Sequence, residues 1–312
     1  MRFHVITSFF ITVATITSAC AAQDASQSIE GIGPTGEVTK LHTGFAFTEG
    51  PASDGEGNVY FTDIPNARIH KIDSQGRLTV FTDQSRHANG LMFRGPHEMI
   101  ACEMDGSLAA WNTQTGERTL LVSGYQDKRF NAPNDLVIDQ QGGIYFTDPH
   151  FRAPEPLPQG VTAVYYADRD GKVTRLIEDL PAPNGVSLSP DEKTLYVFPS
   201  GQAEMMSYPV EGPGKIAEGK EFCRLRQQGD EGNSGADGVT IDTQGNLYIT
   251  SGLGLQVYNP QGEYLGVISV PEQPANVTFG GPDRKTLYVT ARTSLYTIPM
   301  QAQGHVFGPR EQ

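Results

Sequence analysis

The chain repeats one pattern of apolar and polar positions, which is clearest between Asn131 and Asp148. A polar pair, Asn134 and Asp135, precedes the apolar run 136–138. A glycine-containing turn and a second run rich in β-branched and aromatic residues follow, and the pattern ends at Asp148. An apolar run, a tight turn and a returning run predict two antiparallel strands joined as a hairpin.

The pattern occurs six times, at intervals of roughly 40 to 50 residues, which is the spacing expected of propeller blades. Further strand-like runs follow each copy, as at 68–72, 78–81 and 173–177. Four strands per repeat predict an all-β fold, a six-bladed β-propeller with four antiparallel strands in each blade. The second runs begin at Asn58, Glu98, Ile144, Thr194, Asn246 and Thr286.

The start of the chain is typical of an exported protein. Arg2 precedes the largely apolar stretch 5–16, which is too short to span a bilayer as a helix, and small residues follow at 18–22. We therefore predict a secretory signal peptide over 1–22 and a periplasmic or extracellular location. Cys20 also allows lipoprotein processing with a lipid anchor, and ordinary cleavage after Ala21 or Ala22 is the alternative.

The remainder is expected to form a flexible leader over 23–35 and a single propeller domain over 36–312. Within that domain, a short strand between 36 and 44 would complete the last blade beside the C-terminal strands. Such closure removes an exposed sheet edge. Thirty-five glycines and 21 prolines suit a chain with frequent turns, and no long amphipathic segment predicts a helix.

The net charge and the cysteine content argue against nucleic-acid binding and against a disulfide. A net charge of −13 argues against nucleic-acid binding, which depends on clustered Lys and Arg. A small-molecule partner is expected, with no membrane span, and the sequence does not indicate an oligomeric state. Cys102 and Cys223 fall on strands of different blades, which predicts two buried thiols instead of a disulfide.

A residue with a side-chain oxygen opens each repeat. Because the innermost strand of a blade lines the central axis, six equivalent positions at its start would form a ring at one mouth of the channel. Such a ring is a candidate cation site. Turn chemistry is the alternative, since Asn-Gly and Asp-Gly pairs are common in turns, but Glu49 is a poor turn former. The six residues are Glu49, Asn89, Asn134, Asn184, Asp237 and Asn276.

Five short stretches resemble the signature sequences of the SMP-30/gluconolactonase/LRE family, whose fold and metal site are similar to those of the phosphotriesterase and paraoxonase propellers. The stretches are 49–51, 133–136, 145–149, 183–186 and 236–239, and the likeness runs from about Phe47 to Pro299. The resemblance implies one divalent cation, usually Ca²⁺. It implies as ligands Glu49, Asn134, Asn184 and Asp237, and it assigns to Asp237 the role of proton acceptor.

That donor set favours Ca²⁺. Two carboxylates and two amide oxygens form a hard, oxygen-only shell, which suits Ca²⁺ better than the stricter Mg²⁺. Zinc of the usual kind is disfavoured because the sequence has no HExxH motif and no Cys/His cluster. Zn²⁺, Mn²⁺ and Mg²⁺ remain alternatives.

Loops that follow the second strands should share the mouth with the ring. Arg129 and Asn131 resemble the substrate-contacting Arg and Asn of the family by their neighbourhood, although Arg129 is equally well explained as a solvated loop charge. Asn89 and Asn276 are not ligands that the family requires, and they are interpreted as residues that line the pocket or support the ligands.

Asp148 and His150 begin the longest of these loops, which is rich in proline and extends to Val161, so that it is a candidate lid. Asp148 and His150 are accordingly predicted to face the substrate. Lone loop histidines are more often surface residues, and either His87 or His150 is held in reserve as a general base.

Two classes of function remain open. The first is an exported, metal-dependent hydrolase of the gluconolactonase kind that opens a sugar lactone or similar small cyclic ester, with the metal polarising the carbonyl and Asp237 activating water. Within this class, aryl-ester or organophosphate hydrolysis is the alternative. The second is a non-catalytic propeller that binds a partner and uses a structural metal to close its channel.

Overall fold

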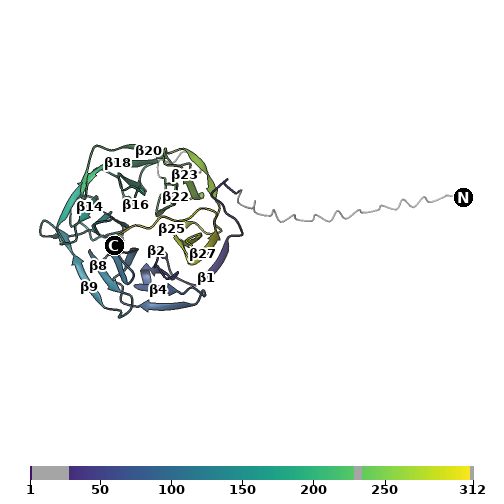
Figure 1. Cartoon of the computed structure of the whole chain (residues 1–312), viewed down its shortest axis with the longest axis horizontal. Helices are drawn as coiled ribbons and strands as arrows, with labels where there is room; N and C mark the ends of the chain where they lie inside the picture. The colour runs from purple at the N-terminus through teal and green to yellow at the C-terminus, as the bar shows by residue number, and fades with distance from the viewer. Residues whose placement is uncertain (2–27, 228–233, 310–312) are drawn as a thin grey trace.

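Six antiparallel sheets radiate from a central axis in the computed structural model, which describes Met1 and residues 28–227 and 234–309 (Figure 1). Four sheets contain the four strands of one repeat, a fifth has one additional short strand, and the sixth is completed by the first strand of the chain. The predicted six-bladed β-propeller is therefore confirmed. The predicted signal segment beyond Met1 and the start of the leader lie outside the described residues.

The first three blades follow one another in sequence. Blade one is formed by β2 (Thr48–Ser53), β3 (Val59–Asp63), β4 (Arg68–Ile72) and β5 (Leu78–Thr82), with the 3₁₀ turn η1 (Ile64–Asn66) after β3. Blade two is formed by β6 (Ala88–Phe93), β7 (Glu98–Glu103), β8 (Ser107–Asn112) and β9 (Arg118–Val122). Blade three is formed by β12 (Leu136–Ile138), β13 (Ile144–Asp148), β14 (Ala163–Ala167) and β15 (Val173–Ile177), after a hairpin of β10 (Gly124–Tyr125) and β11 (Lys128–Arg129).

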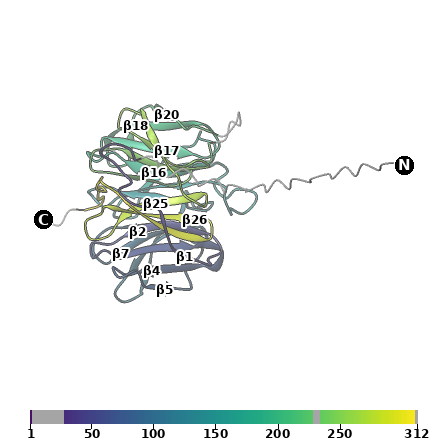
Figure 2. The same cartoon turned by 90° about the vertical axis from the view of Figure 1, so that its right-hand side faces the viewer.

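Blade four carries one additional short strand. Its strands are β16 (Pro183–Leu188), β17 (Thr194–Pro199), β18 (Glu204–Gly212), β19 (Lys215–Ile216) and β20 (Lys220–Arg224). Blade five is formed by β21 (Val239–Ile241), β22 (Leu247–Ser251), β23 (Gly254–Tyr258) and β24 (Tyr264–Ile268). Blade six is formed by β25 (Pro274–Gly280), β26 (Thr286–Ala291), β27 (Ser294–Pro299) and β1 (Thr39–Thr43). Figure 2 shows β16, β25 and β26 running from one face of the disc to the other.

The hairpins at the axis are fixed by acidic residues at their first position. In blade three, Oδ1 of Asp139 accepts hydrogen bonds from the backbone N–H groups of Gln141 at 3.0 Å and Gly143 at 2.8 Å. Gly142 adopts a φ of 83°, which favours glycine. Asp54 and Asp242 accept equivalent bonds in blades one and five. The repeated turn sequence thus sets the length of the inner hairpin.

Threonines on the second strands connect neighbouring blades. The hydroxyls of Thr62 and Thr147 donate to the backbone oxygens of Asn89 and Asn184, at 3.2 and 2.7 Å. Each acceptor is the residue that opens the next blade. A side chain of one blade therefore fixes the backbone of a ring position in its neighbour.

The apolar faces of adjacent blades form the core. Trp111 on β8 packs beside Tyr60 and Ile69 of blade one. Cys102 and Cys223 are buried free thiols, which confirms that prediction. No helix within the described ranges is long and apolar enough to cross a membrane.

Residues 28–35 pack against the last blade, although the sequence suggested a flexible leader there. Ile32 is 5% exposed and belongs to the same apolar cluster as Met300. The N–H of Thr35 donates to the carbonyl of Pro299 at 2.8 Å. Burial of a single apolar side chain and a few backbone bonds are enough to attach this short segment, and sequence pattern alone gave no sign of them.

The propeller is closed by the pairing of β1 with β27, as predicted. Glu272, ahead of β25, accepts hydrogen bonds from Lys40 at 2.9 Å, from Ser294 at 2.6 Å and from Tyr296 at 2.9 Å. Partial burial acts to raise the pKa of Glu272, but the bonds from Ser294, Lys40 and Tyr296 outweigh it and lower the pKa to about 2. One carboxylate therefore joins the first strand to the last.

Replacing Glu272 by Gln is expected to reduce the free energy of unfolding at pH 7 by about 1 kcal/mol, a modest figure because Lys40 remains solvated. A lowered folded-state pKa contributes stability that is present above 4.5, the ordinary value, and is lost as the pH falls toward about 2. Denaturant unfolding at several pH values should show that the free energy of unfolding falls less between pH 4.5 and about 2 in Glu272→Gln than in wild type. The exposed control Glu218→Gln should match wild type, and a wild-type profile in Glu272→Gln would contradict the role of this carboxylate.

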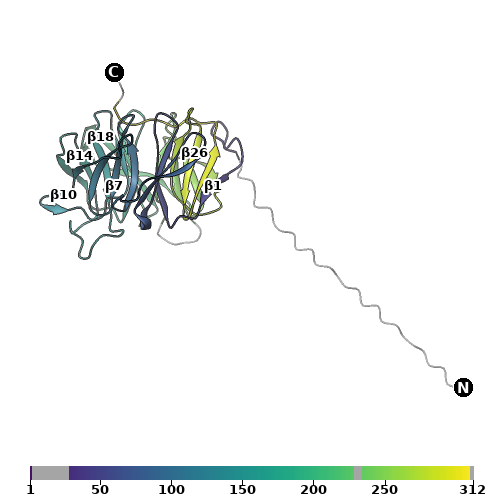
Figure 3. The ribbon, with the colours of Figure 1, turned by 90° about the horizontal axis from the view of Figure 1, so that it is seen from below.

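The two faces of the disc differ. The β10–β11 hairpin projects from one face, and the C-terminal segment lies on the other (Figure 3). This segment crosses three blades: the N–H groups of Gly304, His305 and Gly308 donate to the carbonyls of Arg284, Ile241 and Ile138, at 2.9, 3.0 and 3.1 Å. The end of the chain therefore ties blades six, five and three together across one mouth of the channel.

Candidate functional site

The strand pairing defines which residues occupy the ring around the axis. Glu49, Asn89, Asn134, Asn184 and Asp237 occupy equivalent positions at the start of the inner strand of each blade. In blade six this position belongs to Ala275, because Asn276 pairs with Thr290 as Gly185 pairs with Phe198 in blade four. The predicted sixth member, Asn276, was therefore wrong by one residue, because the inner hairpin of blade six is longer: Thr278 pairs with Tyr288, whereas Val137 pairs with Tyr145 in blade three.

Glu49 and Asp237 approach each other across the channel. Their carboxyl groups lie close enough that each affects the pKa of the other. Burial raises the pKa of Glu49, against the hydrogen bonds from Gly50, Asn276 and Asp237. Burial raises the pKa of Asp237 well above its ordinary value, and the negative charge of Glu49 raises it further. Asp237 is partly exposed because the channel beside it reaches solvent.

The amide members of the ring are held by their neighbours. The side-chain nitrogen of Asn184 donates to Oγ of Ser200 at 3.0 Å and also bonds to Asp237. Asn134 is 4% exposed, and its backbone oxygen accepts the N–H of Gly90 at 2.7 Å. Asn89 is also 4% exposed, and its Oδ1 is buried with no hydrogen-bond partner among the described residues. The structure thus brings together the four predicted ligands and Asn89.

The donor set of this ring fits a hard cation. Among the described residues, no Lys or Arg forms an ion pair with Glu49 or Asp237. Buried carboxylates are normally paired or bound to a metal, and the unpartnered Oδ1 of Asn89 adds an unused acceptor. Nowhere in the described ranges do three His, Cys, Asp or Glu side chains converge as a metal site by themselves. A cation here would therefore need amide oxygens as well as carboxylates.

Asp135 is a third buried carboxyl group at the axis, to which the sequence pattern assigned no role. Burial and the charge of Glu49 raise its pKa to about 8, against hydrogen bonds from the N–H groups of Leu136 and Val186 and from Asn276. The available signal was its position after the opening residue, where four other blades have glycine. Ser200, which holds Asn184, carried no signal in the sequence.

Asn131 and Asp148 do not face the mouth, contrary to their predicted substrate contact. Both are 0% exposed. The carboxylate of Asp148 accepts the N–H groups of Asn131 at 2.9 Å and Ala132 at 2.8 Å. The amide of Asn131 donates to the carbonyls of Asp148 and Val161, and its Oδ1 accepts the N–H of Gln159 at 3.0 Å. Both side chains hold together the two loops beside the ring.

Replacing Asn131 by Ala should lower the free energy of unfolding by about 2 kcal/mol, because buried backbone groups of the 148–161 loop lose their partners. Thermal or denaturant unfolding measures this effect. The exposed Asn66→Ala, which removes one bond to Asp63, is the control and should cost much less. Unchanged stability combined with a raised KM would instead restore the substrate-contact interpretation.

The remaining mouth residues are accessible. The guanidinium of Arg129 lies over Gly106 and donates to the carbonyls of Phe130 and Asn131. His150 is exposed and contacts the ring of Phe151. His87 lies 2.9 Å from a carboxylate oxygen of Asp105. Of the predicted substrate contacts, Asn89 lies in the ring, and Arg129 and His150 lie at the rim.

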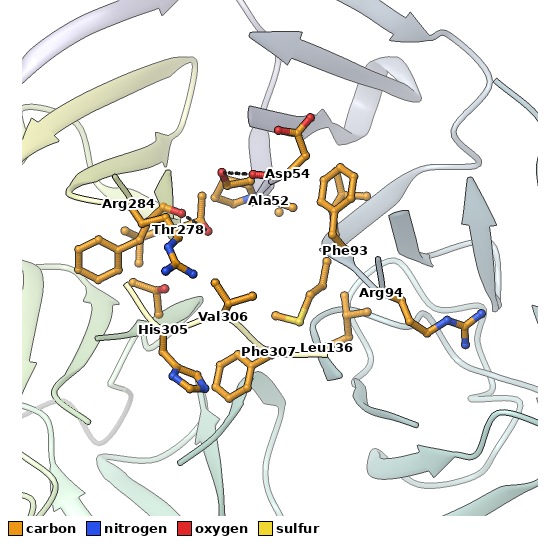
Figure 4. Close-up of a pocket in the computed structure, with 18 of the residues that line it drawn as sticks. Ala52, Asp54, Phe93, Arg94, Leu136, Thr278, Arg284, His305, Val306 and Phe307 are labelled. Carbon is orange, nitrogen blue, oxygen red and sulfur yellow. Dashed lines mark hydrogen bonds between the residues drawn. The ribbon is translucent and has the colours of Figure 1, made fainter. Parts of the chain in front are cut away.

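A cavity of about 570 Å³ occupies the opposite end of the channel (Figure 4). Its wall combines apolar side chains, among them Phe93, Leu136 and Phe307, with charged ones such as Asp54, Arg94 and Arg284. It is not lined by Glu49, Asn134, Asn184 or Asp237, but its inner end reaches Gly50, Asp135 and Asn276. This cavity is therefore separate from the candidate active site, and a thin layer of residues divides the two.

A family model described as the SMP-30/Gluconolactonase/LRE-like region matches residues 47–293. The chain belongs to the SMP-30/gluconolactonase/LRE family. The resemblance seen in five short stretches is thereby confirmed. All the ring positions of this SMP-30/gluconolactonase/LRE member lie within the matched region.

Several relatives of this family member are similar over most of their length. The chain is 28% identical to the gluconolactonase of Zymomonas mobilis, over 93% of each sequence. It is 30% identical to lactonase drp35 of Staphylococcus aureus, over 82% of this chain and 84% of that one. The solved structure of a gluconolactonase from Xanthomonas campestris superposes with a TM-score of 0.77 at 28% identity, covering 84% of this chain and 89% of the other.

Proposed function

We propose that the protein is a metal-dependent hydrolase that opens a sugar lactone or a similar small cyclic ester. The observation that carries this proposal is the Glu49–Asp237 pair at the axis, in which Glu49 is buried and Asp237 is partly exposed, with amide side chains around it and without a basic partner among the described residues. Relatives that match the chain over most of its length are named gluconolactonase and lactonase, which supports the lactone as substrate class.

The ligands of the cation would be Glu49, Asn134, Asn184 and Asp237. Hard oxygen donors favour Ca²⁺, which tolerates irregular coordination and open positions. When bound, the divalent cation supplies an electrophile that polarises the lactone carbonyl. Asn89 and Arg129 would contact the hydroxyl groups of the sugar from the ring and the rim.

Asp237 is the residue best placed to activate water. Burial and the negative charge of Glu49 raise the pKa of Asp237, which makes its carboxylate a stronger proton acceptor. In the proposed reaction, Asp237 takes a proton from water as the water oxygen bonds to the carbonyl carbon. The ring C–O bond then breaks, and the same proton passes from Asp237 to the departing alkoxide. The product is an open-chain hydroxy acid, released as its carboxylate.

A substrate panel tests the proposal directly. Chelator-stripped protein would be assayed with and without Ca²⁺, Mg²⁺, Mn²⁺ and Zn²⁺ on glucono-1,5-lactone, other lactones, an aryl ester and a phosphotriester. Metal-dependent opening of lactones in preference to the other substrates is the expected result. Preference for the aryl ester or the phosphotriester would instead indicate an aryl-ester or organophosphate hydrolase. Inertness on the whole panel, with metal still raising thermal stability, would indicate a structural metal and a binding function.

Export is part of the proposal and rests on the sequence alone. The apolar stretch 5–16 and the small residues before Ala22 support a signal peptide, and Cys20 provides a site for lipidation. Mass spectrometry of the mature N-terminus from the producing cell would distinguish a lipid-modified Cys20 from cleavage after Ala21 or Ala22.

A further inference from the structure

A second level of residues lies directly behind the ring, at the position that follows each opening residue. Four blades have glycine there, namely Gly50, Gly90, Gly185 and Gly238. The other two blades have Asp135 and Asn276, which are 8% and 6% exposed. Two buried polar side chains therefore share a level of the channel that is otherwise formed by glycine.

The Asn276 amide is fixed at every hydrogen-bonding position. Its Oδ1 accepts the backbone N–H of Val277 at 2.8 Å, which directs the amide nitrogen away from the strand. The amide contacts the carboxyl groups of Glu49 and Asp135 and lowers the pKa of each. A contact that lowers the pKa of a carboxyl group stabilises its charged form, so the N–H groups of Asn276 face the two carboxyl groups. One side chain thus joins the ring to the level behind it.

Gly238 provides the space for this amide. A Cβ atom at Gly238 would lie 2.0 Å from both Cγ and Oδ1 of Asn276, closer than any real contact. Gly238 is not among the residues with positive φ, so its backbone would accept alanine. The absence of a side chain is required here by the Asn276 amide and not by the conformation of the chain.

We propose that Asn276 is a positioning residue of the metal site, seated against Gly238 and holding the Glu49 carboxylate in the orientation that binds the cation. The N–H of Gly50 donates to Oε2 of Glu49 at 2.6 Å, and Asn276 supplies the second bond that limits rotation of the carboxylate. Asn276 borders the far cavity, on the other side of the ring from the mouth, so that it acts through Glu49 and not on the substrate. This inference rests on the proposed function, because it concerns the cation that Glu49 would hold.

The test measures Ca²⁺ affinity of the full chain after chelator treatment, by isothermal titration calorimetry. Removing a group that orients a metal ligand typically weakens metal binding by about 10- to 100-fold, and we expect this loss for Asn276→Ala. Gly238→Ala should weaken binding similarly, because its methyl group displaces the amide. Gly212→Ala, whose Cβ would meet nothing within 4 Å, is the control and should bind as wild type does.

The double variant Gly238→Ala with Asn276→Ala separates positioning from general damage. Its new methyl group occupies the space left by the amide, so that the two changes should be non-additive and the double variant should bind Ca²⁺ no more weakly than Asn276→Ala alone. Melting temperatures measured without metal should stay near that of wild type. In the double variant the methyl group introduced at position 238 fills the space that the Asn276 amide leaves, so this variant keeps the test valid if Asn276→Ala alone does not fold.

Two results would overturn the inference in different ways. Wild-type affinity in Asn276→Ala and in the double variant would remove the positioning role and leave the proposed metal site intact. Strictly additive losses in the double variant would show that Gly238 and Asn276 act independently. If the wild-type protein itself binds no divalent cation, the proposed function fails together with the inference.

Discussion

Asp237→Asn is expected to lower kcat for lactone opening by about 10³-fold, the size of effect typical for loss of a general base. Asn keeps the shape of the side chain and an oxygen that can face a cation, but it cannot take a proton from water. The fold should persist because the side chain lies at the solvent-connected channel and not in the apolar core. Steady-state kinetics on glucono-1,5-lactone with saturating metal measures the effect.

The matched control is Asp283→Asn, which changes an exposed turn on the opposite side of blade six and should leave kcat unchanged. Metal affinity should be measured on both variants, so that loss of the base is distinguished from loss of the cation. An Asp237→Asn enzyme that is fully metal-loaded and retains wild-type kcat would exclude Asp237 as the base. His87 and His150 at the rim would then be the next residues to substitute.

Removal of the metal should lower the melting temperature by about 10 °C. A ligand present at 1,000 times its Kd stabilises the folded state by about 4 kcal/mol, and each kcal/mol corresponds to roughly 2 to 4 °C in a domain of this size. The physical reason is that Glu49, Asp237 and Asp135 lie together at the axis, and without the cation their mutual repulsion is relieved only by protonation. Differential scanning fluorimetry of stripped and reloaded protein measures the shift.

Glu49→Gln should abolish most of this metal-dependent shift, because it removes one of the two carboxylates that would bind the cation. The variant Glu218→Gln, on an exposed part of blade four, should show the full shift. Equal melting temperatures for stripped and reloaded wild type, at metal concentrations that saturate activity, would contradict a cation bound at the axis.

The sequence repeat was sufficient to predict the propeller because the same turn and strand residues recur in each blade. The turn aspartates, such as Asp139, and the second-strand threonines, such as Thr147, recur at fixed offsets and have the same partners in several blades. The closing strand β1 could be predicted for a different reason, since an open edge in blade six would be unfavourable. The packing of Ile32 could not, because it depends on a surface formed only after closure.

The sequence predicted which types of residue form the candidate site, but it was less accurate for their exact positions on the strands. Glu49, Asn184 and Asp237 follow from counting back along each repeat, whereas the longer inner hairpin of blade six makes the same count end at Asn276, one residue after Ala275. Asp135 received no role of its own because its neighbours in sequence gave no indication that Glu49 lies close to it. Asn131 was taken for a substrate contact because burial by a later loop is invisible in the local sequence.

The pairing of β1 with β27 also determines when the site can exist. Lys40 and Glu272, which meet at this seam, are 232 residues apart, so that closure is a contact of very high sequence separation and is expected late in folding. The proposed ligands come from blades one, three, four and five, and their spacing around the axis is set only when the circle is complete. A nascent or truncated chain that lacks the last blade would contain every proposed ligand and still have no metal site. Acquisition of the cation would then report the final step of folding.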